Sequence, residues 1–140
     1  MNTLGHIIYY VDDVEKTIEF YEKAFGLQRA FIDETGSYGQ LETGTTALGF
    51  ASKSLAKQNL GNGFRAISRD ELPGVEISFT TKDVARALSH AVKSGAELIA
   101  PPDAKPWGQT IAYVRDFNGI LIEISSEMAG CSNDNSCCCH

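Results

Sequence analysis

The chain has 140 residues, of which 43% are hydrophobic and 21% charged, and its formal net charge is −6. These values are typical of a globular protein of one domain, or of two half-size modules. The acidic balance disfavours nucleic acid and anionic membranes as partners, because both need a basic footprint. No apolar run approaches the ~20 residues of a membrane span, and the first residues lack a signal-peptide pattern. We therefore expect a cytoplasmic protein with no membrane partner.

Residues 1–51 are predicted to form a first module with the order β-α-β-β-β. Residues 4–11 are rich in β-branched and aromatic side chains, which indicates a strand. Asp12 or Asp13 can cap the helix that follows, and Gly26 is a suitable end for it. The helix has an apolar face with spacings of four, three and four, formed by Val14, Ile18, Tyr21 and Phe25. Three strands are expected after it, at about 28–33, 37–43 and 45–51.

A polar connection at 52–73 separates this module from a second one at 74–127. A connection of about 20 residues is long enough to suggest a lid or a linker. The second module restarts with strictly alternating residues at 75–80, as in a half-buried strand. A helix with Val84, Leu88 and Ala91 on one face follows, and the remaining strands are expected at about 96–100, 108–114 and 119–125.

The two modules are related by an internal repeat. Asp13-Val14 recurs as Asp83-Val84, 70 positions later, and at that offset His6 falls on Glu76. At an offset of 69, Tyr38-Gly39-Gln40 falls on Trp107-Gly108-Gln109. Duplication of a small unit indicates the architecture independently of any single motif. We predict an α+β fold in which two βαβββ modules form a curved sheet around a cup, lined by equivalent positions of both.

Residues 128–140 show no periodicity and are expected to form a disordered tail. The tail holds all four cysteines, Cys131, Cys137, Cys138 and Cys139. Cysteines confined to one end do not form the disulfide framework of a secreted fold, and they fit a reducing compartment. Adventitious metal binding or thiol reactivity of the tail is the alternative to an incidental extension.

With these elements in place, the chain resembles the vicinal oxygen chelate superfamily over about residues 3–126. This superfamily includes glyoxalase I, extradiol dioxygenases and bleomycin-resistance proteins. The resemblance rests on the run from His6 to Val14, on Phe20-Tyr21 and Phe25-Gly26, on Lys105-Pro106-Trp107-Gly108-Gln109-Thr110, on Val114-Arg115-Asp116-Phe117-Asn118-Gly119 and on Leu121-Ile122-Glu123. It implies the glyoxalase/bleomycin-resistance fold and a homodimer. It does not imply one activity, because a fold of this kind hosts many chemistries.

In metal-dependent members, the ligands come from the first and last strands of each module. The resemblance therefore implies His6, Glu76 and Glu123 as ligands of one divalent metal ion, Zn, Mn, Ni or Fe. The fourth position falls at about Gly49, which has no side chain to coordinate. Many family enzymes carry His where this chain has Glu76. If Glu76 is not a firm ligand, it could act as the general base.

Two functions remain open. The first is a metal-free protein that binds a small organic molecule, cationic or planar, in the cup between the modules. Its candidate contacts, with Glu76 and Glu123, are Trp107, Tyr10, Phe50, Ser78 and Tyr113. The second is a divalent-metal-dependent lyase, isomerase or dioxygenase. The absent fourth ligand and the negative charge favour binding slightly.

Structural roles are the alternative for these same residues. Glu76 and Glu123 could be solvated, or paired with Arg115 or Lys105. Trp107 and its repeat partner Tyr38 could each begin a central strand and pack a corner, and Tyr10, Phe50 and Tyr113 could form core or wall.

Overall fold

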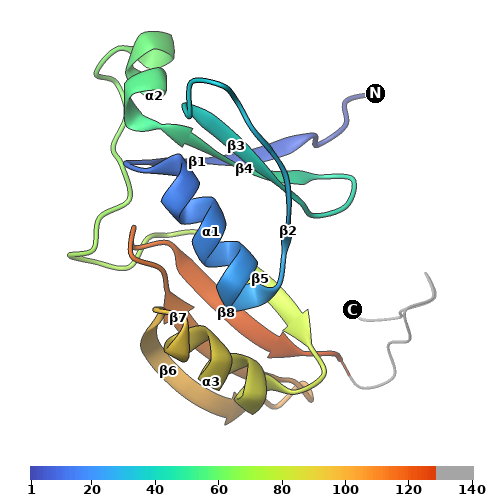
Figure 1. Ribbon diagram of the computed structural model, residues 1–140. Coiled ribbons are helices and arrows are strands. Elements are labelled where there is room, and N and C mark those ends of the chain that lie inside the picture. Colours follow the sequence, from blue (N-terminus) through green and yellow to red (C-terminus); the bar gives the residue numbers. More distant parts are fainter. Residues whose placement is uncertain (129–140) are drawn as a thin grey trace. The chain divides into compact units, whose positions relative to one another are not determined.

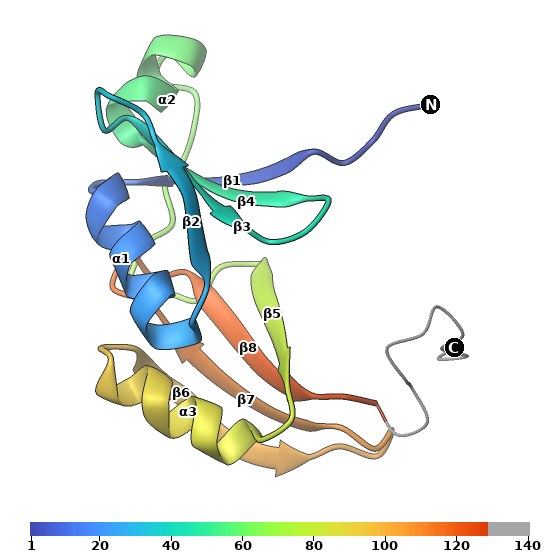
Figure 2. The same cartoon turned by 45° about the vertical axis from the view of Figure 1, so that its right-hand side comes forward.

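The computed structural model describes residues 1–128 and divides the chain into two compact units, with the boundary between Arg69 and Asp70. Each unit contains a four-stranded mixed sheet and a helix between its first two strands, in the order β-α-β-β-β, and the first unit ends with a second helix (Figures 1 and 2). The predicted α+β fold with two βαβββ modules is confirmed. No helix within residues 1–128 is both long and apolar enough to cross a membrane.

The first unit contains two helices and four strands. These are β1 (His6–Val11), α1 (Val14–Phe25), β2 (Gln28–Ile32), β3 (Tyr38–Glu42), β4 (Ala47–Ser52) and α2 (Lys53–Leu60). Its sheet has the order β1-β4-β3-β2, with β1 parallel to β4 and the other neighbours antiparallel. Because β1 and β4 are parallel, the chain has to cross over between them, and α1 lies within that connection.

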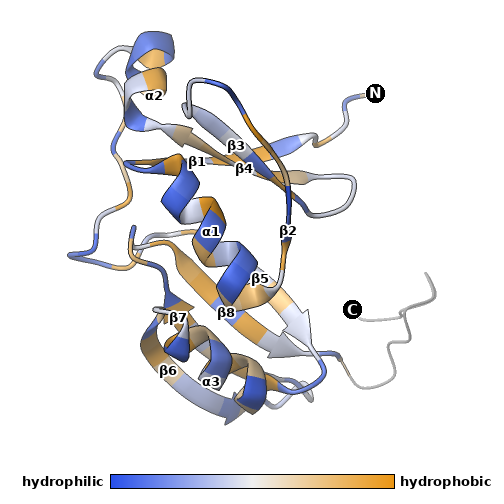
Figure 3. Cartoon of the chain, viewed as in Figure 1, coloured by the Kyte–Doolittle hydropathy of each residue, from blue (hydrophilic) through white to orange (hydrophobic). Residues whose placement is uncertain are grey.

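Local signals explain where α1 begins and ends. The Asp13 side chain accepts a hydrogen bond from the Lys16 backbone N–H at 3.0 Å, and Gly26 adopts a left-handed conformation with φ 68°. The face of the helix toward the sheet is fully buried at Ile18 and Tyr21. Side chains alternate along β1, so Tyr9 shares this core, whereas His6, Ile8 and Tyr10 lie on the other face of the sheet. In Figure 3, α1 and α3 show the alternating hydrophobic and hydrophilic bands of amphipathic helices.

The connection predicted at 52–73 begins with a helix that the sequence pattern did not indicate. Ser52 caps α2 by accepting a hydrogen bond from the Leu55 backbone N–H at 3.0 Å, and Ala56 is buried on the sheet side. Lys53 forms an ion pair with Asp12 at 2.9 Å, which ties the start of α2 to the corner after β1. A helix of eight residues with one buried side chain leaves little apolar periodicity to detect.

The second unit repeats the connectivity of the first. Its elements are β5 (Glu76–Thr81), α3 (Val84–Lys93), β6 (Glu97–Ala104), β7 (Thr110–Arg115) and β8 (Leu121–Ser126). The sheet order is β5-β8-β7-β6, with β5 parallel to β8. Asp83 caps α3 by accepting from the Arg86 backbone N–H at 3.1 Å. The sheet face that α3 covers is buried, and Val114, Ile122 and Ile124 are among its buried residues.

Strand β6 continues past the predicted end at residue 100, through Pro101 and Pro102. The sheet tolerates both prolines because β6 is an edge strand whose register with β7 shifts between Ala100 and Asp103. Proline cannot donate a hydrogen bond to a neighbouring strand, so it is confined to edges and bulges.

The sheet registers correct one part of the predicted repeat. In the first unit Tyr38 lies opposite Ala51, two residues before the pair formed by Gln40 and Gly49. In the second unit the corresponding pairs are Ile111 with Ser125 and Tyr113 with Glu123. Tyr38 therefore corresponds to Ile111, and the predicted correspondence with Trp107 is wrong. Trp107 lies in the loop before β7, where it does not begin a strand.

Candidate functional site

A group of polar side chains lies on the face of the second sheet opposite α3. The parallel register of β5 and β8 places Ser78 beside Glu123, and the antiparallel register of β7 and β8 places Tyr113 on its other side. Glu76 precedes Ser78 by two residues and shares its face, because side chains alternate along a strand. We call Glu76, Ser78, Tyr113 and Glu123 the Glu123 cluster.

Both carboxylate oxygens of Glu123 accept hydrogen bonds from hydroxyl groups. Ser78 donates from Oγ to Oε1 at 2.7 Å, and Tyr113 donates from its phenolic oxygen to Oε2 at 2.9 Å. Three strands thus hold one carboxylate in a fixed orientation. The sequence indicated the shared face of Glu76 and Ser78, but not this network, because it depends on pairing across strands.

The two carboxyl groups of the cluster, Glu76 and Glu123, repel each other when both are charged. Burial raises the pKa of Glu76 above its ordinary value of 4.5, and the charge of Glu123 together with a hydrogen bond to it raises this pKa further. Burial, and then the hydrogen bond to Glu123, raise the pKa of Tyr113 to about 12. Tyr113 is therefore a neutral donor at physiological pH, and the charge of the cluster comes from its two carboxyl groups.

No cation forms an ion pair with Glu76 or Glu123 within residues 1–128. Arg115 instead holds Glu97 through two hydrogen bonds, from Nε at 2.7 Å and from Nη2 at 3.2 Å. Lys105 pairs with Asp103 at 2.8 Å. The interpretation that Arg115 or Lys105 pairs with the two glutamates is therefore wrong. A neighbouring pair of carboxyl groups without a cation is a site where a positively charged ligand gains Coulomb energy.

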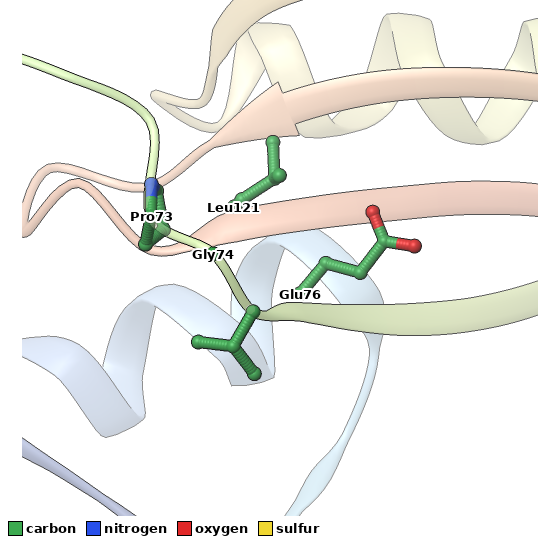
Figure 4. A pocket seen from close by; sticks show the side chains of 5 residues that line it. Pro73, Gly74, Glu76 and Leu121 are labelled. Carbon is green, nitrogen blue, oxygen red and sulfur yellow. The ribbon is translucent and has the colours of Figure 1, made fainter.

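A hollow of about 310 Å³ opens beside Glu76. It is lined by Pro73, Gly74, Val75, Glu76 and Leu121 (Figure 4). Leu121 is the register partner of Glu76 across β5 and β8, so the two side chains lie next to each other on one face. Sequence reasoning missed Pro73, Val75 and Leu121, because each of them reads as an ordinary apolar or turn residue.

The first unit differs from the second at the position equivalent to Glu123. Ile8 pairs with Gly49 as Ser78 pairs with Glu123, so Gly49 holds the equivalent place. A Cβ atom at Gly49 would lie 2.5 Å from the hydroxyl oxygen of Tyr38, which donates to Gln40 Oε1 at 2.9 Å. Any side chain at Gly49 would have to displace Tyr38, and the space of a fourth ligand is thus already filled.

The predicted metal ligands belong to different units. His6 is exposed at the start of β1 in the first unit, whereas Glu76 and Glu123 are neighbours in the second. Among residues 1–128, no three or more His, Cys, Asp or Glu side chains are grouped so that they could hold a metal ion. The set of His6, Glu76 and Glu123 stays a prediction. The Cys-rich tail beyond residue 128 lies outside the described residues.

Three of the predicted ligand contacts, Phe50, Tyr10 and Trp107, have partners outside the Glu123 cluster. Phe50 is fully buried and stacks on Tyr21 at 5.2 Å between ring centroids, so its assignment to a ligand-facing surface is wrong. Tyr10, also in the first unit, packs edge-on against Phe64 at 5.2 Å. Trp107 is 54% exposed, and its Nε1–H donates to Gln109 Oε1 at 2.7 Å.

Trp107 lies before Thr110, the first residue of β7. Arg115, the last residue of β7, pairs with Leu121 beside the hollow. Strand β7 has six residues, and at about 3.3 Å per residue its two ends are roughly 17 Å apart. An aromatic ligand stacked on Trp107 is therefore remote from the hollow beside Glu76.

The raised pKa of Glu76 predicts a pH dependence of stability. The folded state binds the Glu76 proton more tightly than the unfolded chain, so the stability that this group contributes is present at pH values below 4.5 and is lost as the pH rises through the raised folded value. We expect Glu76→Gln to become more stable relative to the original chain across that window. Urea denaturation of both proteins between about pH 4 and pH 7 measures the difference. A difference that stays constant with pH would contradict the assignment.

The family model described as Glyoxalase/Bleomycin resistance protein/Dioxygenase superfamily matches residues 3–124. The chain is 24% identical over 115 residues to the uncharacterized protein YraH of Bacillus subtilis, covering 81% of this chain and 90% of that protein. It is 26% identical over 129 residues to a lactoylglutathione lyase of Arabidopsis thaliana, covering 85% of this chain but only 42% of the plant protein.

Solved structures show the same fold. A glyoxalase/bleomycin resistance protein/dioxygenase family enzyme from Burkholderia phytofirmans matches with a TM-score of 0.79 at 20% identity, covering 89% of this chain and 98% of that one.

Proposed function

We propose that this chain, which belongs to the glyoxalase/bleomycin resistance protein/dioxygenase superfamily, binds a small organic cation at the Glu123 cluster. The observation that carries this proposal is the pair of carboxyl groups, Glu76 and Glu123, surrounded by neutral hydroxyls. As with many members of the superfamily, we expect a homodimer.

The orientation of Glu123 supports a binding role. Its two oxygens are already fixed by Ser78 and Tyr113, so little side-chain freedom is lost when a ligand arrives. Binding to a preorganised group costs less entropy than binding to a mobile one. A cation would also relieve the repulsion that raises the pKa of Glu76.

The donor set of this unit does not by itself fit the divalent metal that members of the superfamily often use. It provides two carboxylates, with no imidazole or thiolate beside them, whereas Zn²⁺ and Ni²⁺ sites usually include such ligands. In the first unit, the place equivalent to Glu123 is Gly49, covered by the Tyr38 hydroxyl. A divalent-metal-dependent lyase, isomerase or dioxygenase is the second candidate function. The similarity to the plant lactoylglutathione lyase is the observation in its favour.

A melting experiment tests the first function. The purified chain is heated with small ammonium and guanidinium salts, and in parallel with neutral alcohols of matching size and at equal ionic strength. A ligand that binds only the folded state raises the melting temperature. We expect the organic cations to raise it and the alcohols to leave it unchanged. Equal effects of cations and alcohols would contradict the proposal.

Metal analysis of the same preparation, after mild purification, addresses the second function. Stoichiometric metal that is lost in the double variant His6→Ala, Glu123→Ala would support the metal-dependent enzyme. Absence of metal, together with stabilisation by organic cations, would support the binding function.

A further inference from the structure

The hollow beside Glu76 has one polar end and an otherwise aliphatic lining. Of its five lining residues, Glu76 alone carries a charge, while Pro73, Val75 and Leu121 contribute aliphatic carbon. Its volume is about 310 Å³, whereas an apolar cavity of about 150 Å³ is enough to hold benzene. The hollow therefore has room for an aliphatic group as well as for a charged head beside the carboxylate.

The lining residues also limit which class of ligand the hollow can bind. None of the five lining residues is aromatic, so stacking and cation–π contacts are not offered by these walls. Trp107 lies beyond the opposite end of β7, as described above. The ring of Tyr113 lies beside Glu123 and is not part of this lining. An alkyl chain in the hollow therefore gains from removal of its methylene groups from water and not from contact with a ring.

Charge complementarity fixes the orientation of the occupant. The carboxyl group of Glu76 projects from the lining beside Leu121 (Figure 4), and beyond it Glu123 is held by Ser78 and Tyr113. Arg115, which pairs with Leu121 across the strands, is engaged by Glu97 through two hydrogen bonds. A positive head is therefore expected at Glu76, with the apolar part of the same molecule toward Pro73 and Leu121.

From this arrangement, we infer that the ligand class of the site is an aliphatic primary ammonium ion, whose head lies at Glu76 and Glu123 and whose alkyl chain occupies the hollow beside Leu121. The inference rests on the proposed function, because it requires that the Glu123 cluster binds organic cations. It adds that an aliphatic chain contributes to affinity.

Titration calorimetry with three probes tests the inference. Hexylammonium carries the head and the chain, methylammonium carries the head alone, and hexan-1-ol carries the chain alone. Burial of several further methylene groups predicts that hexylammonium binds at least about tenfold more tightly than methylammonium. Hexan-1-ol is expected to bind more weakly than hexylammonium, because it lacks the charge.

Two matched variants test whether the alkyl chain of the ligand binds in the hollow. Leu121→Asn changes the wall of the hollow, and we expect it to remove most of the preference for hexylammonium over methylammonium. Leu98→Asn makes the same change at an exposed position on β6 that is not part of the lining, and we expect it to keep the preference. Circular dichroism confirms that both variants are folded.

The outcomes separate this inference from the proposed function. If both ammonium ions bind with equal affinity, or if Leu98→Asn and Leu121→Asn behave alike, the aliphatic ligand class is wrong while cation binding stands. If ammonium and guanidinium ions all fail to bind, the proposed function itself is wrong, and the inference is lost with it.

Discussion

Replacement of Glu123 by Gln is expected to weaken the binding of a small organic cation by roughly 10- to 100-fold. The change removes one of the two negative charges, and it replaces an accepting oxygen with an NH₂ group that cannot accept from Ser78 or Tyr113. Hydrogen bonds to a charged group contribute about 1.5–3 kcal/mol, which corresponds to this range of affinity. Titration calorimetry with hexylammonium measures the loss.

Two control variants separate local charge from general charge. Glu42→Gln makes the same change at an exposed residue of β3 in the first unit, and it is expected to leave the affinity unchanged. Tyr113→Phe keeps both carboxyl groups and removes only one hydroxyl donor, so its effect should be smaller than that of Glu123→Gln. Retention of full affinity by Glu123→Gln would exclude the Glu123 cluster as the binding site.

Replacement of Asp116 by Ala is expected to destabilise the second unit by about 3 kcal/mol. Asp116 is 1% exposed, and its Oδ1 accepts hydrogen bonds from the backbone N–H groups of Asn118 at 2.8 Å and Ile120 at 2.9 Å. These bonds shape the turn between β7 and β8, the two central strands of the sheet. Loss of the acceptor leaves buried donors unsatisfied, at a cost of about 1–3 kcal/mol for each group.

The fluorescence of Trp107 during urea denaturation reports this effect. It is the single tryptophan of the chain, and it lies in the second unit, so its transition follows that unit. Asp116→Asn retains one oxygen acceptor and should cost less than Asp116→Ala. Asp33→Ala is the control in the first unit, where Asp33 accepts similar bonds from Ser37 and Tyr38 in a more exposed turn. It is expected to shift the Trp107 transition less than Asp116→Ala does. An Asp116→Ala transition at the same urea concentration as the original chain would contradict the assigned role.

Local chemistry was sufficient for most of the elements. The helix at 14–25 could be predicted because Asp13, the apolar spacing and Gly26 all act within a few residues of one another. The eight strands were predicted from alternation and turn residues, and all are present with shifts at their ends. Helix α2 was missed because it depends on the Ser52 cap and on packing of Ala56 rather than on a repeated apolar pattern.

The candidate site could be predicted only in part. Alternation along 75–80 indicated that Glu76 and Ser78 share a face, and the resemblance pointed to Glu123. The network itself joins Ser78 to a residue 45 positions away, and no local pattern specifies that pairing. The same limit explains Trp107, which the sequence repeat matched to Tyr38 but which the sheet registers place outside β7.

The sequence by itself determined the duplicated βαβββ order and the polar face of β5 that carries Glu76 and Ser78. Only the tertiary structure decided that Glu123 lies between Ser78 and Tyr113, that Arg115 is taken by Glu97, and that Tyr38 covers Gly49. The reason is physical: alternation follows from the geometry of a single strand, whereas register is fixed by packing between distant segments, and a slip of one residue would turn every side chain to the other face.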